Sequence, residues 1–178
     1  STVRKVLDPE RDQPTDHYIA ADARALTLRT DHVRVDVTEF FAAVADAVRA
    51  ADQGDWTNAD RKCADAELLY RGDFLEEDRY EDWALDCRER ARTTAGTAVR
   101  LRARAARERG DREAASMYLL RLVDRDPYDE DSWTALIALQ TQLRRHGEAR
   151  RLYSMYSRRM DELDIAPAPF AALSASAR

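Results

Sequence analysis

From residue 38 onward, hydrophobic and polar positions alternate with the period of an amphipathic α-helix. The first such segment places Phe40, Val44 and Val48 on one face, and Thr38 precedes it as a candidate N-cap. Glycines and an Asp-Pro pair interrupt the pattern at intervals, as expected where helices end. The pattern predicts helices over residues 39–51, 57–70, 80–109, 112–125, 130–145 and 148–163.

The first 37 residues show a different pattern. Residues 3–7 resemble the end of a helix, which Asp8 and Pro9 would stop. Valines alternate with charged residues from Val33 to Val37, which is the period of a half-buried strand. We therefore predict three short strands here, over residues 17–20, 25–29 and 33–37.

Small and large residues recur in the helical part at the length of a tetratricopeptide repeat. Ala115 and Ala149 lie 34 residues apart, and each is followed four positions later by a large side chain, Leu119 or Tyr153. A small residue lets two helices approach closely, and the large one fills the next groove. The spacing predicts stacked antiparallel helical hairpins and disfavours a set of unrelated ones.

The helix breaks follow the same repeat. Gly110 precedes Ala115, Pro127 follows that alanine, and Trp133 opens the W-x2-L pattern of a first repeat helix. A weaker, earlier unit lies around residues 54–63. These breakers and packing residues are therefore expected to be structural.

One aromatic-rich stretch, residues 68–83, lies between the earlier unit and the longest predicted helix. We expect Gly72 to end a helix with a positive φ and Phe74 to fill the corner that follows. The next helix is predicted to start near Tyr80, with Trp83 in its core. The stretch is thus interpreted as a joint between helices.

Composition and charge narrow the classes of function. The chain is 35% charged and 44% hydrophobic, and its formal net charge of −5 argues against nonspecific coating of nucleic acid. It has two cysteines and no apolar run of membrane-spanning length, so we expect a reducing, cytoplasmic setting and no membrane contact.

The sequence shows no pattern of catalytic or metal-binding residues. Its glycines are isolated, so no phosphate-binding loop is formed, and its three histidines lack the spacing of metal ligands. We therefore expect no catalytic residue, no cofactor and no metal, and a protein that is not an enzyme.

The order of these motifs resembles the bacterial transcriptional activation domain of actinobacterial pathway regulators, the antibiotic-regulatory and AfsR-like proteins. The motifs that carry the resemblance lie at residues 69–75, 80–83, 126–130 and 147–153. The resemblance covers about residues 33–170 and implies a mainly α fold. Its expected form is tetratricopeptide-like antiparallel helical hairpins in a right-handed array.

In that family, an OmpR-like winged-helix DNA-binding domain precedes the activation domain. Residues 3–9 resemble the last turns of its recognition helix, and residues 17–29 resemble its wing. The resemblance therefore implies a strand-rich remnant of that domain over residues 1–37, the activation domain over 38–165 and a flexible tail over 166–178.

The same resemblance suggests where the remnant would touch DNA. Arg4, Lys5 and Arg24 are the candidates, and they would contact the phosphate backbone because most of the base-reading helix is missing. Promoter DNA would be bound mainly through that missing part.

Three arginines of the longest helix are candidates for contacting a protein. Arg100, Arg104 and Arg107 share one helix face, although such a stripe is usually solvated or paired with a neighbouring helix. The resemblance implies a transcriptional activator whose partner is RNA polymerase or another domain of the same regulator. A tetratricopeptide-like peptide-binding adaptor, or a ligand-sensing domain of a larger regulator, remains the alternative. Exposed strand edges also leave a homodimer open.

Overall fold

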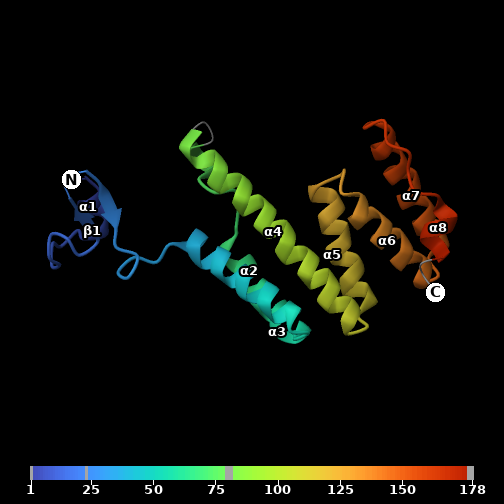
Figure 1. Ribbon diagram of the computed structural model, residues 1–178, viewed down its shortest axis with the longest axis horizontal. Coiled ribbons are helices and arrows are strands. Elements are labelled where there is room, and N and C mark those ends of the chain that lie inside the picture. Colours follow the sequence, from blue (N-terminus) through green and yellow to red (C-terminus); the bar gives the residue numbers. More distant parts are fainter. Residues whose placement is uncertain (1, 23, 79–81, 176–178) are drawn as a thin grey trace.

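The computed structural model describes residues 2–22, 24–78 and 82–175 and is mainly helical. A small N-terminal unit lies at one end of the molecule, and a longer array of antiparallel helices makes up the rest (Figure 1). The N-terminal unit comprises α1 (Thr2–Leu7), β1 (Ile19–Ala21) and β2 (Leu26–Leu28). The array comprises α2 (Asp36–Asp52), α3 (Trp56–Leu69), a short 3-10 turn (Glu76–Asp78), α4 (Asp82–Glu108), α5 (Arg112–Arg125), α6 (Glu130–Gln142), α7 (His146–Asp161) and α8 (Phe170–Ala175). The predicted mainly α fold is confirmed.

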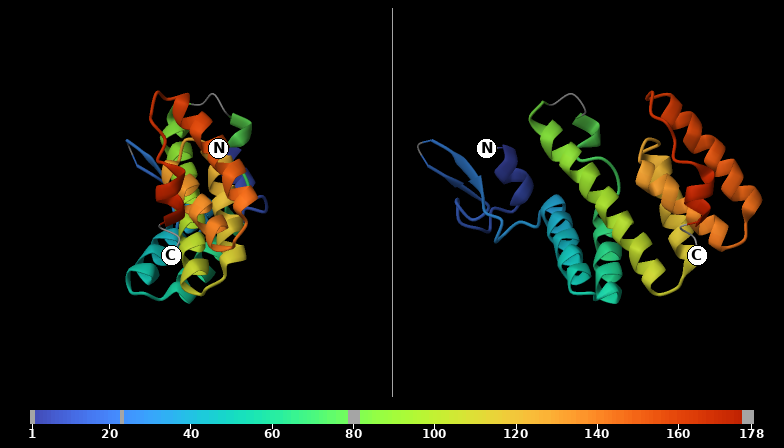
Figure 2. Two further views of the ribbon diagram at one scale, coloured as in Figure 1. Left: turned by 90° about the vertical axis from the view of Figure 1, so that its right-hand side faces the viewer. Right: turned by 45° about the vertical axis from the view of Figure 1, so that its right-hand side comes forward.

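Successive helices pair as antiparallel hairpins: α2 with α3, α4 with α5, and α6 with α7 (Figure 2). Ala59, Ala115 and Ala149 occupy equivalent places in the second helix of each hairpin, and all three are 0% exposed. The backbone N–H of each donates to the carbonyl four residues before it, at the residue that caps the helix. Ala115 and Ala149 are therefore the close packing points that their spacing predicted, and Ala59 has the same place in the weaker, earlier unit.

The turns inside the hairpins share one backbone conformation. Gly54 and Gly110 take φ values of 77° and 75°, and the aspartate after each accepts a hydrogen bond from the backbone N–H three residues on. In the third turn, Arg144 stands at the equivalent position with a φ of 58°. Gly147, which we expected to break the helix, lies inside α7. That expectation is wrong because the left-handed residue comes three positions earlier.

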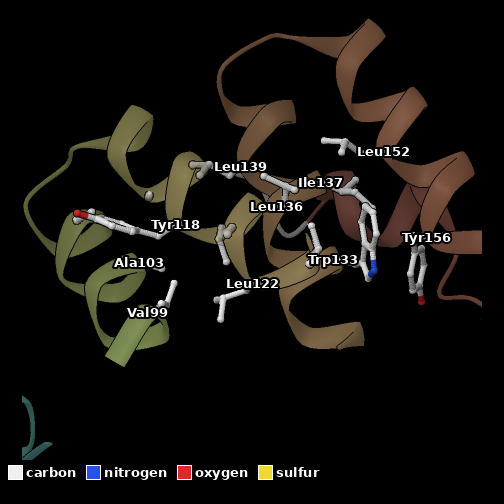
Figure 3. Close-up of a cluster of buried hydrophobic side chains, with 14 of the residues drawn as sticks. Val99, Ala103, Tyr118, Leu122, Trp133, Leu136, Ile137, Leu139, Leu152 and Tyr156 are labelled. Carbon is white, nitrogen blue, oxygen red and sulfur yellow. The ribbon is translucent and has the colours of Figure 1, made fainter. Parts of the chain in front are cut away.

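Two hydrophobic cores and a small cluster of Ala50, Ala51 and Ala59 hold the array together. The first, between α2, α3 and α4, consists mostly of alanines, with Phe40 and Cys63 as its largest fully buried side chains. The second lies between α4, α5, α6 and α7 and contains larger side chains (Figure 3). Trp133 is 3% exposed there, and its Nε1 donates to the carbonyl of Pro127 at 2.9 Å. This hydrogen bond fastens the α5–α6 turn to the second core.

The N-terminal unit contains a two-stranded hairpin in its described residues. β1 pairs antiparallel with β2, with Ala20 opposite Thr27. The Asp22 carboxylate accepts hydrogen bonds from the backbone N–H groups of Arg24 and Ala25, at 2.7 and 2.8 Å. An aspartate side chain therefore closes the turn where a glycine is more usual.

The predicted third strand, over residues 33–37, is wrong. α2 already begins at Asp36, and Val35 is its extended N-cap residue, so Thr38 lies inside the first turn. The valines of this segment are half-buried, which explains their alternation with charged residues. No further strand pairs with them in the described parts of the chain, because β1 and β2 pair only with each other.

Trp83 is not a core residue, contrary to expectation. Its side chain is 69% exposed, because the first turns of α4 direct Ala84 and Arg88 to the interior. Trp83 is one position away from this buried stripe, which rotates it by about 100° around the helix. The predicted helix start at Tyr80 lies outside the described residues.

The joint bends at a different residue from the one expected. Gly72 does not take a positive φ, whereas Leu75 does, with a φ of 50°. A Cβ at Gly72 would approach only the flexible carboxylate of Glu76, at 3.0 Å. Phe74 packs against the first core, as its assignment to the corner predicted.

The segment after α7 forms a helix where a flexible tail was expected. The ring of Phe170 in α8 packs edge-on against Tyr153 at 5.3 Å, and the Arg150 guanidinium lies 4.2 Å from its centroid. The backbone N–H of Ala168 donates to the Tyr156 hydroxyl at 2.8 Å. The expectation is therefore wrong for this segment, because its apolar residues complete the second core.

Replacing Arg144 by glycine should stabilise the protein. A non-glycine residue in the left-handed region costs about 1–2 kcal/mol, and the greater freedom of glycine in the unfolded chain offsets part of the gain. We expect Arg144→Gly to raise the free energy of unfolding by about 0.5–1 kcal/mol in urea titrations followed by circular dichroism. Gly110→Ala is the matched control and should lower stability by about 1 kcal/mol. A less stable Arg144→Gly variant would contradict the proposed equivalence of the turns.

Candidate protein-interaction surface

One side of α4 carries the arginines that the sequence predicted to share a face. Arg100, Arg104 and Arg107 are exposed and line a single hollow, together with Arg112 at the start of α5. We call this site the arginine hollow. The structure thus brings the three predicted residues together and adds Arg112, which the sequence reasoning missed because it lies beyond the break at Gly110.

Arg100 is engaged by the neighbouring hairpin. Its Nη2 donates to Oδ2 of Asp129 at 2.6 Å, and Asp129 also caps α6 by accepting from the backbone N–H and the hydroxyl of Ser132. Burial opposes ionisation of Asp129, but the hydrogen bonds from Arg100 and Ser132 outweigh it and hold its pKa below the usual value. Arg100 therefore joins α4 to α6 and is not available to a partner.

The other three arginines line the hollow without an ion pair in the described part of the chain. The Arg104 guanidinium lies 4.6 Å from the centroid of the Trp56 ring of α3, a cation–π contact with a residue that does not itself line the hollow. Arg107 and Arg112 are exposed, and within the described residues neither forms an ion pair with a carboxylate. The side of the hollow formed by the end of α4 and the start of α5 is therefore positively charged.

The arginine hollow has a volume of about 660 Å³ and lies between α4, α5 and α6. Its floor is apolar, and each floor residue keeps 3–6% of its surface exposed. The floor consists of Ala103, Leu119, Leu122 and Leu139. Two exposed acids, Glu108 and Asp131, also line it. The site combines apolar contact area with charges of both signs, with positive charge in excess.

A smaller hollow of about 240 Å³ adjoins the first. The two share Arg107, Leu139 and Gln142 as lining residues. Leu173 of α8 lines the smaller hollow only. The C-terminal helix thus borders the continuation of the groove along α6.

The joint between the first hairpin and α4 is held by two arginines that the sequence reasoning did not single out as a pair. Arg88 is 5% exposed, and its Nε donates to the carbonyl of Phe74 at 3.0 Å. Arg92, one turn further on, donates from Nε to Oδ1 of Asp73 at 3.0 Å. This hydrogen bond is the main reason that the pKa of Asp73 falls to about 2. Arg88 and Arg92 lie four residues apart, so they share one face of α4. This spacing is the only sequence signal that could have indicated that both contact the joint.

A second group of charges joins three helices on the side of α4 away from the hollow. Arg102, 18% exposed, donates to Asp60 at 2.9 Å and to Glu67 at 2.6 Å, both on α3. Arg121 of α5 also reaches Glu67, at 3.1 Å. Arginines two positions apart in the sequence therefore serve different purposes, since a helix turns by about 200° between them.

The N-terminal candidates for DNA contact are placed differently from one another. Arg4 is half-buried and donates from Nη2 to the carbonyl of Ile19 at 3.2 Å, so it fastens α1 to the hairpin. Lys5 and Arg24 are exposed. Contact of these three residues with DNA stays a prediction.

The described residues offer few other sites for chemistry. No group of three or more metal-ligating side chains is placed to hold an ion in these parts of the chain. Burial raises the pKa of the Cys63 thiol to about 12, so this cysteine is an unreactive packing residue at neutral pH. None of the helices described is both long and apolar enough to cross a membrane.

Comparison with known families identifies the class of this chain. The model of the bacterial transcriptional activator domain matches residues 35–175, which include the whole helical array and the arginine hollow. The chain belongs to this family. It therefore carries a transcription-regulator domain, and the resemblance described from its motifs is confirmed.

A solved structure shows the same fold. The chain is similar to Mycobacterium tuberculosis EmbR, solved in complex with a low affinity phosphopeptide, with a TM-score of 0.72 and 24% sequence identity. The match covers 90% of this chain and 43% of that one, so the chain spans less than half of EmbR. The structural match covers more of the chain than the family model does, which spans residues 35–175. The structural likeness to EmbR therefore extends into the segment before residue 35. No curated protein sequence matches the chain significantly.

The ion pair at the joint should make stability depend on pH. The folded-state pKa of Asp73 lies below its unfolded value, so the pair stabilises the fold above about pH 4 and is lost as the pH falls towards 2. Because both side chains are partly exposed, we expect Asp73→Asn to cost only about 1 kcal/mol at pH 7.

The measurement is urea unfolding of wild type and variant between pH 7 and pH 2.5. The difference between them should shrink through this window. The control is Asp124→Asn, which replaces an exposed aspartate of α5 and should change stability by less than about 0.5 kcal/mol at every pH. A difference that is constant with pH would show that the Arg92 pair is not its cause.

Proposed function

We propose that this chain is the helical-repeat part of a transcriptional activator and contacts a protein partner through the arginine hollow. By resemblance, the partner is RNA polymerase or another domain of the same regulator. The observation that carries the proposal is the set of three arginines, Arg104, Arg107 and Arg112, that line the hollow around an apolar floor and form no ion pair within the described residues. Such a site provides charge for steering a partner and apolar area for holding it. No bond is made or broken, because the mechanism is recruitment.

The N-terminal unit supports placing the chain next to a DNA-binding module. A helix followed by a two-stranded hairpin is the order of elements at the end of a winged-helix domain, and it directly precedes the activator domain here. The peptide-binding adaptor would use the same hollow. Membership of the activator family, together with this helix–hairpin unit, favours the regulator.

The isolated chain should bind duplex DNA weakly and without sequence preference. Its exposed candidates, Lys5 and Arg24, are suited to phosphates, and the net charge of −5 opposes approach to DNA. We expect a Kd weaker than about 1 μM at physiological salt in fluorescence anisotropy, with similar values for unrelated duplexes.

The control for DNA binding is the Lys5→Ala, Arg24→Ala double variant. It should weaken the residual binding of all duplexes alike and reduce its dependence on salt. Tight binding that is selective for one sequence would contradict this prediction.

Tethering the chain near a promoter should activate transcription. We expect a fusion of the whole chain to an unrelated sequence-specific DNA-binding domain to raise reporter expression in an actinobacterial host. The Arg104→Glu, Arg107→Glu double variant should lose most of this activation, because it reverses two charges of the hollow.

The reporter assay needs controls for tethering and for net charge. The DNA-binding domain alone sets the baseline. The matched variant, Arg11→Glu with Arg158→Glu, reverses two exposed arginines outside the hollow and should activate like wild type. Expression at the baseline for the wild-type fusion, with normal protein levels, would refute the proposed function.

A further inference from the structure

Two features of the arginine hollow bear on the chemistry of its partner. The first feature is that three of its guanidinium groups lack carboxylate partners in the described part of the chain. Arg107 and Arg112 have none within the described residues, and Arg104 contacts only the Trp56 ring there. Arg102 of the same helix, by contrast, donates to two acids at 2.6 and 2.9 Å. The hollow is therefore a place where this chain supplies cations and leaves their anions to another molecule.

The second feature is the apolar floor between these cations. Leu119, Leu122 and Leu139 are 3–6% exposed, and all three line the hollow. Its volume of about 660 Å³ lies within the range of pockets that enclose small ligands or a few side chains. The floor favours an occupant that carries aliphatic side chains next to its negative charges.

We propose that the arginine hollow binds an acidic peptide segment of a partner protein, with carboxylates on Arg104, Arg107 and Arg112 and an aliphatic side chain on the leucine floor. This inference deepens the proposed function and rests on it for its biological setting. Arg100 is excluded from the contacts because Asp129 already occupies it. The smaller hollow beside Leu173 extends the site along α6, so the segment runs from the α4–α5 turn towards α8.

The lining acids favour a peptide over a nucleic acid as the occupant. Glu108 and Asp131 repel any anionic group, and a phosphate backbone has no N–H groups that could offset this repulsion. A peptide carries backbone N–H donors that these carboxylates accept, and the exposed amide of Gln142 pairs with either of its backbone groups. The same site that binds an acidic peptide thus disfavours DNA.

Fluorescence anisotropy with the full chain tests this proposal. The probe is a labelled nine-residue peptide made of three glutamate–aspartate–leucine repeats. Its comparison peptides are the neutral glutamine–asparagine–leucine version and the basic lysine–arginine–leucine version. We expect saturable binding of the acidic peptide, at least about tenfold weaker binding of the neutral one, and weakening as salt rises. The basic peptide should not bind at the hollow.

Matched variants assign the binding to the hollow. Arg107→Ala with Arg112→Ala should weaken binding of the acidic peptide by roughly five- to tenfold. Arg107→Lys with Arg112→Lys keeps both charges and should stay within about threefold of wild type. Arg11→Ala with Arg158→Ala removes two charges outside the hollow and should change the Kd by less than about twofold. Thermal unfolding verifies that each variant is folded.

Several outcomes would overturn the inference. They are no saturable binding of the acidic peptide, equal binding of its neutral version, or binding that the Arg107 and Arg112 substitutions do not change. Duplex DNA that competes at the hollow more strongly than the peptide would assign the arginines to phosphates. Self-association that these substitutions abolish, measured by light scattering, would assign the hollow to a second copy of the chain.

The peptide assay and the reporter assay fail independently. A tethered chain that activates transcription through Arg107 without binding the acidic peptide would keep the proposed function and refute the acidic-segment inference. Binding of the acidic peptide at the hollow without activation of the reporter would support the acidic-segment inference and refute the proposed function.

Discussion

Close approach of helices at three buried alanines is the constraint on which the rest of this structure depends. Ala59, Ala115 and Ala149 have no exposed surface, and each stands one turn into the second helix of its hairpin. A larger side chain there would push the two helices apart, because protein interiors have no spare volume to absorb it. The stacking of the hairpins, and with it the hollow between α4, α5 and α6, follows from this contact.

The same constraint explains why so many arginines take part in the structure. The first core is built mostly from alanines, which bury little apolar surface, so polar contacts at its edges contribute more of the specificity. Arg88 and Arg92 hold the joint, and Arg102 joins α3 to α4. Arg107 and Arg112, which have no such partner among the described residues, line the arginine hollow. The hydrogen-bond partners of each arginine therefore distinguish those that stabilise the fold from those that can contact another molecule.

Much of the fold could be predicted because its signals are local. The repeat of small, large and breaker residues placed the hairpins, and the family motifs identified the class of regulator. The errors came where a local pattern had a different cause. Half-buried valines before α2 imitated a strand, Gly147 resembled a break although Arg144 bends the chain, and Trp83 resembled a core residue although the neighbouring positions are buried.

The sequence alone established a mainly α repeat protein of the activator family and placed Arg100, Arg104 and Arg107 on one helix face, because helical period and repeat length are properties of the chain. It could not show which of these arginines are available to a partner protein, because that depends on which side chains of other helices lie next to each guanidinium group. The packing of α6 against α5 brings Asp129, the N-cap residue of α6, to Arg100, and the start of α5 places Arg112 in the same hollow as Arg107. The hollow exists only through these contacts between segments distant in sequence, so its position and its charge are properties of the tertiary structure.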